Sequence, residues 1–377
     1  MRTRRLLVLL TALLTTLLAV VSCAKDSGTA GSSSGNCKLN DAPTGTPPAA
    51  STVPAPAPGS ASALKVGVAF DIGGRGDTSF NDAAGAGIDK AKKDLGVTDT
   101  KELTASPNES TADATTRLRQ LVAGGYNPII AVGFKYADAL KVAAAETPNV
   151  KFAIVDGVVD GATNVTPLVF TEEQGSFLVG AAAAYKTKAC HIGFIGGVET
   201  PLIKKFEAGY IQGAKAVAPD IKIDSKYLTP AGDFTGFNDP AKGAVATKGE
   251  LDNGADVIYH AAGGSGPGVF QSVKTASTKD NPKWAIGVDS DQYNQPNLAA
   301  VKDIILTSML KRVDVAVFDY ISAVAGNNLA ALPKAFDLKV DGVGYATSGG
   351  FVDDIKAKLD GYKAQIIGGQ VTVKTTP

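Results

Sequence analysis

The sequence predicts an α/β fold with two lobes, each built on a parallel sheet. From Leu64 onward, short apolar segments alternate with amphipathic stretches of helical period, the pattern of a parallel sheet that helices cover on both faces. The region from Leu64 to Pro377 is long enough for two domains with a substantial core. The two halves of this region also begin in the same way, which favours two similar lobes.

Six apolar segments are expected to be strands. In chain order they are Val66–Phe70, Ile129–Gly133, Phe152–Val155, Ile192–Ile195, Val257–Ala261 and Trp284–Val288. Four amphipathic stretches between or after them are expected to be helices. These are Ala83–Leu95, Thr111–Val122, Leu202–Val217 and Val313–Val324. In the first, Ile88, Ala91 and Leu95 follow one another at spacings of three and four, so they share one helix face.

The internal similarity concerns the first strand of each half. Val66–Phe70 leads to Gly73-Gly74, and Ile192–Ile195 leads to Gly196-Gly197. Ligands of open α/β sheets bind beside loops of this kind, at the carboxyl ends of the strands. Two such lobes facing each other would form a cleft.

The composition excludes several classes of protein. The 377 residues are 44% hydrophobic and 20% charged, which argues against a disordered chain or a coiled coil. The 37 basic residues balance 37 acidic ones, so no positive excess favours nucleic acid as a partner. Removal of residues 1–22 would remove three of the basic residues and leave a slight acidic excess.

The N-terminus has the features of an export signal. Arg2, Arg4 and Arg5 precede the apolar run Leu6–Val21, which is shorter than the ~20 residues that span a bilayer. The run ends at Ser22-Cys23, which resembles a bacterial lipobox. Residues 1–22 are therefore expected to be a lipoprotein signal peptide, and Cys23 to be acylated, so that the protein is exported and held at the outer face of the cytoplasmic membrane.

Residues 23–63 are expected to be a linker. They are rich in Ser, Gly, Ala and Pro and contain almost no large apolar side chains, which predicts a disordered tether with a reach of roughly 35 Å. Lipidation of Cys23 would leave Cys37 and Cys190. In an exported protein these two thiols can form a disulfide or stay free, and the sequence leaves both possibilities open.

Three loops carry candidate binding chemistry. Asp71 begins a Gly-rich loop whose spacing and acidic Asp77 do not fit a dinucleotide fingerprint. The small residues after His260 let backbone amides approach a ligand, and the scarcity of nearby Lys and Arg favours a neutral, hydroxyl-bearing ligand over a phosphate. Asp289 ends a strand and Lys311 follows, and together a carboxylate and an ammonium group can bind a sugar diol.

Six ordered motifs resemble those of the basic membrane protein family, the PnrA-like nucleoside-binding lipoproteins of ABC importers. The motifs are Phe70-Asp71-Ile72-Gly73-Gly74, Thr78-Ser79-Phe80-Asn81, Phe206-Glu207-Ala208-Gly209-Tyr210, Gly236-Phe237-Asn238-Asp239-Pro240, Tyr259-His260-Ala261-Ala262-Gly263-Gly264 and Gly287-Val288-Asp289-Ser290-Asp291-Gln292. The resemblance implies a type I periplasmic-binding-protein fold, with two doubly wound lobes, a hinge and an interlobe cleft. The first lobe would comprise residues 64–168 and about 305–332, and the second residues 169–304 and about 333–377.

The resemblance also implies a role for each matching residue. Phe80 and Phe237 would stack on a purine, Asn81 and Asp156 would read its edges, and Asp71 would line the cleft. Asp289, Lys311 and the backbone of Gly263 would hold the ribose. The implied partners are a nucleoside, an ABC permease with its ATPase, and the membrane through the N-terminal lipid. The protein is expected to be a monomer without cofactor, metal or catalytic residue.

Two residues depart from the family pattern. Arg75 places a cation in the first loop, and Lys135 places another near the expected cleft, so both bear on ligand choice. Two alternatives to a nucleoside receptor remain open. One is a receptor for a sugar or other small ligand on the same fold. The other is a nucleoside-processing enzyme, which is disfavoured because only His191 and His260 are available as histidine acid or base groups and no nucleophile or zinc motif is present.

Overall fold

The computed structural model describes residues 37–51 and 57–377. The expected signal peptide, residues 1–22, and Cys23 lie outside these residues. None of the helices in the described part of the chain combines the length and the apolar character that a bilayer span requires.

The first sheet has five parallel strands in the order β2-β1-β3-β4-β5. They are β1 (Lys65–Phe70), β2 (Asp99–Thr104), β3 (Ile129–Val132), β4 (Phe152–Val155) and β5 (Val165–Leu168). The connecting helices are α1 (Phe80–Leu95), α2 (Thr111–Ala123) and α3 (Ala137–Glu146). The order reverses at β1, so the loops after β1 and β3 lie at a topological switch point, where open α/β sheets bind ligands.

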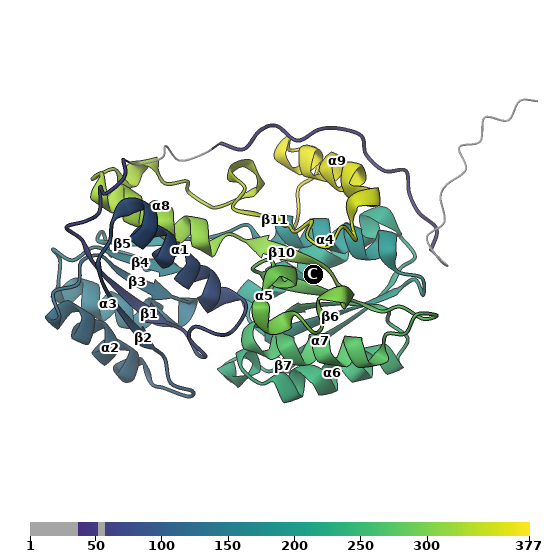
Figure 1. Cartoon of the computed structure of the whole chain (residues 1–377), viewed down its shortest axis with the longest axis horizontal. Coiled ribbons are helices and arrows are strands. Elements are labelled where there is room, and N and C mark those ends of the chain that lie inside the picture. The colour runs from purple at the N-terminus through teal and green to yellow at the C-terminus, as the bar shows by residue number, and fades with distance from the viewer. Residues whose placement is uncertain (1–36, 52–56) are drawn as a thin grey trace, which may run out of the picture. The chain divides into compact units, whose positions relative to one another are not determined.

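The second sheet has six strands in the order β11-β10-β9-β8-β6-β7. They are β6 (His191–Val198), β7 (Lys222–Thr229), β8 (Val257–Ala261), β9 (Trp284–Asp289), β10 (Ile305–Lys311) and β11 (Val343–Tyr345), and only the β10–β11 pair is antiparallel. Helices α4 (Glu172–Lys186), α5 (Pro201–Val217), α6 (Pro240–Asp252), α7 (Gly266–Ala276) and α9 (Lys356–Ile367) accompany this sheet. The prediction of two parallel-sheet α/β lobes is confirmed (Figure 1).

The chain crosses between the lobes three times. It leaves the first sheet after β5, and it returns after β10 to form α8 (Val313–Ala325), which packs on α1. It then goes back to β11. Phe170, on the first crossing, forms a bridge with Phe336, on the third, and their ring centroids are 5.3 Å apart. These adjacent crossings form the hinge.

The expected boundary near residue 305 is wrong for β10. Ile305–Lys311 pairs with β9 and β11 and so belongs to the second sheet, and the return to the first lobe begins only after Lys311. The reason is the hydrogen bonding of β10, which pairs with β9 on one side and with β11 on the other. Lys311 is therefore the last residue of a strand at the hinge.

The described part of the expected linker lies against the folded body, which corrects the prediction of a tether extending to residue 63. Cys37 is buried, and the Asn40 N–H donates to Val217 O at 2.8 Å. The Ser51 N–H donates to Lys339 O at 2.9 Å, and the Ala61 N–H donates to Leu95 O, also at 2.9 Å. Backbone hydrogen bonds and a disulfide hold a segment whose side chains are too small to form a core.

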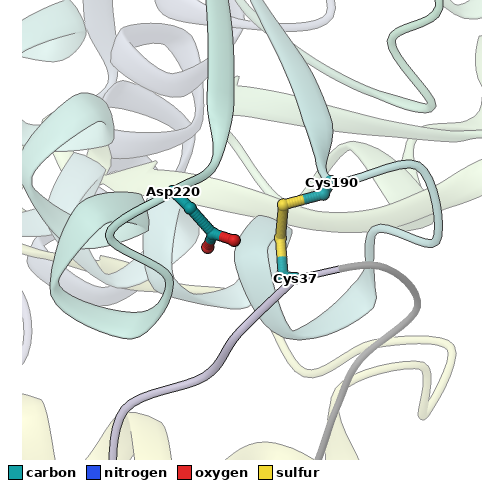
Figure 2. A group of neighbouring side chains, drawn as sticks. All are labelled: Cys37, Cys190 and Asp220. Carbon is teal, nitrogen blue, oxygen red and sulfur yellow. A yellow bond between two sulfur atoms is a disulfide. The ribbon is translucent and has the colours of Figure 1, made fainter.

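The disulfide joins Cys37 to Cys190, the residue just before β6, with Cα atoms 5.1 Å apart (Figure 2). The Asp220 carboxylate lies beside it and accepts the Lys38 N–H at 3.4 Å. These three side chains have the spacing of a metal site, but sulfurs bonded to each other are not thiolate ligands. The cluster is therefore a structural crosslink.

Candidate functional site

All eight residues predicted to bind a ligand line one cavity between the lobes. Asp71, Phe80, Asn81 and Asp156 reach it from the first lobe, and Phe237, Gly263, Asp289 and Lys311 reach it from the second. The space between the side chains is about 580 Å³, part of it open to solvent. The same cavity contains lining residues that the sequence analysis did not assign: Ile72, Asp77, Gly133, Phe134, Leu202, Ile203, Phe206, Ala261, Gly264 and Val288.

Asn81 organises the loop after β1. Its side-chain oxygen accepts the Asp71 N–H, while its NH₂ group donates to Ile72 O and to an Asp77 oxygen, each at 3.1 Å. Both N–H bonds are thus in use, and only the oxygen keeps a spare lone pair. Asp77 in turn accepts the N–H groups of Ser79, Asn81 and Asp82. The loop is pre-formed, and a donor role for Asn81 toward a ligand is not available in this arrangement.

Asp71 and Asp77 are carboxyl groups in an environment that favours protonation. Burial raises the pKa of Asp71 to about 6, and burial likewise raises the pKa of Asp77 to about 6. Asp71 also accepts the Ile72 N–H, at 2.8 Å. Gly133 lies so close that a Cβ there would be 2.8 Å from an Asp71 oxygen, so the residue after β3 must be small.

Asp289 ends β9 and connects the two lobes. Ser79 Oγ donates to Asp289 Oδ2 at 2.7 Å, and Ser290 Oγ donates to Ser79 O at 3.0 Å. Gln292 Nε2 donates to Thr78 O, also at 3.0 Å. Burial raises the pKa of Asp289, and the nearby Lys311 opposes that shift. The start of α1 is therefore hydrogen-bonded to the loop after β9.

Lys311 is 2% exposed and sits among carboxylates at the hinge. It donates to Asp156, and its Nζ is 3.8 Å from Glu172 Oε1. Burial lowers the pKa of Lys311, but Asp156, Asp289 and Glu172 together raise it above its ordinary value. Asp156 Oδ1 has no hydrogen-bond partner although it is buried. Since Asp156 lines the cavity, this oxygen is available to accept a hydrogen bond from a ligand.

Glu172 was not identified from the sequence. It begins α4, is 1% exposed, and lies between Lys311 and Lys205, whose Nζ is 3.1 Å from Glu172 Oε2. Burial raises its pKa to about 7, with Asp156 contributing and Lys311 opposing. Acidic residues are common at helix N-termini because they interact favourably with the helix dipole. The sequence therefore gave no reason to assign Glu172 to the binding site.

Aromatic rings form the apolar walls of the cavity. Phe80 and Phe206 lie 4.8 Å and 5.6 Å, measured to the ring centroids, from Lys311 Nζ. Phe237 packs on β6 at Gly197, where a Cβ would be 2.5 Å from the ring. Phe206 was part of a motif in the sequence, yet only the structure brings it to the cavity. The rings that line the site thus come from both lobes.

Gly263 follows β8 and lies close to the backbone of Phe237. Its φ is +50°, and a Cβ there would be 3.3 Å from Phe237 O. Because a side chain is disfavoured at this φ and has little room, the backbone itself faces the cavity.

Arg75 and Lys135 do not line this cavity. Arg75 pairs with Asp89 and with Glu102, in each case at 2.8 Å, and the Glu102 hydrogen bond is the main cause that raises the Arg75 pKa. Lys135 lines a second cavity and lies 4.6 Å from the ring centroid of Phe234. Arg75 is therefore occupied by structural ion pairs on the surface.

Neither histidine lines the ligand cavity. His191 Nε2 contacts Asp224 Oδ2 at 2.7 Å, next to the disulfide residue Cys190. His260 is fully buried, its ring packs on Phe270, and burial lowers its pKa to about 4. The cavity therefore has carboxylates, a lysine, aromatic rings and backbone groups, a set suited to holding a polar ring-containing ligand.

Residues 64–376 match the Bmp family model, described as ABC transporter substrate-binding protein PnrA-like. A protein of Listeria monocytogenes named CD4+ T-cell-stimulating antigen is 37% identical, over 83% of this chain and 88% of its own length. The ABC transporter nucleoside-binding protein BmpA of Lactococcus lactis is 34% identical, over 82% of this chain and 89% of its own length.

The fold is similar to that of a solved ABC transporter solute-binding protein from Aeropyrum pernix. The TM-score is 0.70 with 26% sequence identity, over 83% of this chain and 93% of that chain. The similarity therefore extends over both lobes.

Proposed function

Because this chain belongs to the Bmp family of PnrA-like ABC transporter substrate-binding proteins, we propose that it captures purine nucleosides for an ABC importer. The observation that carries the proposal is the composition of one cavity. Aromatic rings from both lobes, Phe80 and Phe237, line it together with Asp289 and Lys311. The nucleoside-binding name of the Lactococcus lactis relative supports the same ligand class.

The base would lie between Phe80 and Phe237. Stacking on an aromatic ring stabilises a bound base by about 1–3 kcal/mol per ring and tolerates different bases. Asp156 Oδ1, buried and without a partner, would accept a hydrogen bond from the base or sugar. Asn81 would hold the loop after β1 in place and offer only its oxygen to the ligand, because both its N–H bonds are already donated.

The ribose would lie against Asp289, Lys311 and the backbone of Gly263. A carboxylate can accept from two adjacent hydroxyl groups and an ammonium group can donate to them, and such charge-assisted bonds contribute roughly 1.5–3 kcal/mol each. Lys311 is the last residue of β10 at the hinge. Ligand binding there would favour closure of the lobes, and the membrane permease and its ATPase would act on the closed form.

The proposal includes attachment to the membrane. Acylation at Cys23 would hold the protein outside the cytoplasmic membrane, and the chain would act as a monomer. Because Cys37 is joined to Cys190, the tether in this arrangement would extend from the lipid only to Cys37. A mass increase from acyl groups on an N-terminal Cys23 peptide, absent in Cys23→Ser, would support this anchoring.

Isothermal titration of the purified full-length protein tests the ligand class. We expect adenosine, guanosine or inosine to bind without being consumed, and ribose alone to bind poorly. Phe80→Ala should weaken nucleoside binding by about 1–3 kcal/mol. Phe318→Ala is the matched control, since Phe318 packs beside Lys90 away from the cavity. Tight binding of a hexose with no response to any nucleoside would favour the sugar-receptor alternative, and release of free base would favour an enzyme.

A further inference from the structure

The two lobes also meet through one aromatic ring outside the predicted ligand contacts. Phe234 of the second lobe lies with its ring centroid 5.9 Å from that of Phe134 in the first lobe, and the ring planes are inclined by 60°. Lys135 Nζ, also from the first lobe, lies 4.6 Å from the Phe234 centroid. Tilted aromatic pairs and an ammonium group over a ring are both attractive arrangements.

This contact lies far from the hinge in the second sheet. Phe234 follows β7, which is separated from the hinge strand β10 by β6, β8 and β9. Phe134, Lys135 and Phe234 line the second, larger cavity, and Phe134 lines the ligand cavity as well. When the lobes rotate apart about the hinge, groups far from the hinge move farther than groups near it. The contact of Phe234 with the first lobe must therefore break for the lobes to open.

One short helix connects this contact to the ligand cavity. The 3₁₀ helix η2 (Phe234–Phe237) places Phe234 against the first lobe and Phe237 in the cavity. The helix is held firmly. The Asp233 side chain accepts the Thr235 N–H at 3.1 Å, and Gly236 O accepts the Ser265 hydroxyl at 2.8 Å. A ligand that fixes Phe237 thus also fixes where Phe234 lies.

We propose that Phe234 is a positioning residue for ligand retention, a latch that packs on Phe134 and Lys135 and holds the lobes closed over a ligand seated on Phe237. The inference rests on the proposed function, since it assigns the closing contact of the same site. Phe234 does not line the ligand cavity, so its effect would come through lobe closure.

The first test is the rate at which bound adenosine dissociates from the full-length protein. We expect Phe234→Ala to raise this rate roughly 10-fold, as expected from loss of one aromatic pair and one cation–π contact, with little change in the association rate. Phe234→Tyr, which keeps the ring, should restore slow dissociation. Lys135→Met should raise the rate less, and its effect combined with Phe234→Ala should fall short of the product of the two, because both remove the same contact.

Val245→Ala is the control for a surface change in the same lobe, since Val245 is 75% exposed on α6 and should leave the rate unchanged. An unaltered dissociation rate in Phe234→Ala would overturn the latch while leaving the nucleoside receptor in place. Failure of the wild type to bind any nucleoside would instead contradict the proposed function.

A second test does not depend on a ligand. The pair Phe134→Cys and Phe234→Cys should crosslink with a short bifunctional thiol reagent in the ligand-free protein, whereas Phe134→Cys with Val245→Cys should not. Absence of the first crosslink would overturn the latch whether or not adenosine binds. A crosslink that forms faster with adenosine, and loses that acceleration in Phe237→Ala, is the result expected if η2 couples the two sites.

Discussion

Asp156 directly follows β4 and Asp289 is the last residue of β9, in different sheets, yet both adopt a left-handed backbone conformation, with φ of 65° and 64°, and both line the same cavity. Asp is one of the few residue types other than Gly that occupies this region without large strain. The two carboxylates also act on the same ammonium group, because each raises the pKa of Lys311. A sparsely populated backbone conformation of this kind is maintained because the surrounding structure fixes it, and such conformations cluster at binding sites.

Asp289→Asn should weaken nucleoside binding while leaving the fold stable. Asn tolerates the same left-handed conformation, so the backbone is undisturbed, but the charge-assisted bonds to the ribose are lost, at a cost of about 1.5–3 kcal/mol in binding free energy. Isothermal titration with adenosine measures the effect. Asp303→Asn is the matched control, because Asp303 pairs with Lys274 outside the cavity. Equal losses in both variants would rule out a specific role for Asp289.

Gly197→Ala should weaken binding through Phe237. A Cβ at Gly197 would be 2.5 Å from the Phe237 ring, so the ring must move away from its place in the cavity. We expect a loss of about 1–3 kcal/mol in adenosine binding, the range for one stacking contact.

Gly249→Ala is the control for this glycine substitution. Gly249 lies in α6 of the same lobe with nothing within 4 Å of a Cβ, so binding should be unchanged and the free energy of unfolding should rise by about 0.5–1 kcal/mol. Titration and urea unfolding of the two variants are compared directly. Full adenosine affinity in a folded Gly197→Ala protein would show that Phe237 does not contact the ligand.

Glu172 should make the folded protein less stable as the pH rises. Its pKa is raised by burial from 4.5 to about 7, so between these pH values the unfolded chain has lost the proton that the folded protein keeps. Ionisation then favours the unfolded state, and the free energy of unfolding falls across this window. Glu172→Gln should show a smaller fall between pH 5 and pH 7, measured by urea unfolding.

The pH dependence that remains in Glu172→Gln serves as the control, because it reports the groups other than Glu172. Asp71 and Asp77, whose pKa values burial raises to about 6, contribute a fall of the same sign in both proteins. The difference between wild type and Glu172→Gln isolates Glu172. If the two pH profiles run parallel throughout, the proton at Glu172 is not retained on folding.

The disulfide should stabilise the folded protein without serving ligand binding. It closes a loop spanning 153 residues between Cys37 and Cys190, and removal of such a crosslink typically lowers the free energy of unfolding by about 2–5 kcal/mol. We expect Cys37→Ala combined with Cys190→Ala to show this loss in urea unfolding and to bind adenosine with unchanged affinity. Thiol labelling of the unfolded, unreduced protein should find neither Cys37 nor Cys190 reactive, and two reactive thiols would contradict the crosslink.

The strands that the sequence predicted are almost entirely buried. All six expected segments are strands in the structure, because continuous Val, Ile and Phe runs bounded by Gly are characteristic of parallel sheets. The edge strand β2 was missed because Asp99–Thr104 is polar and only half-buried. Helix α4 was missed for the opposite reason, since nearly all of Glu172–Lys186 is buried and no amphipathic period remains to indicate a helix.

The sequence by itself determined the two α/β lobes, the family and the residues that meet in one cavity, because strand ends and ordered motifs are local features of the chain. Only the tertiary structure decided which partners each of these groups has, and so which hydrogen-bonding groups remain available to a ligand. Asn81 donates both of its side-chain N–H bonds within its own loop, and Glu172 lies next to Lys311. Residues 37–51 lie against the folded body. These outcomes depend on contacts between segments far apart in the chain, whose burial and hydrogen bonding no local pattern encodes.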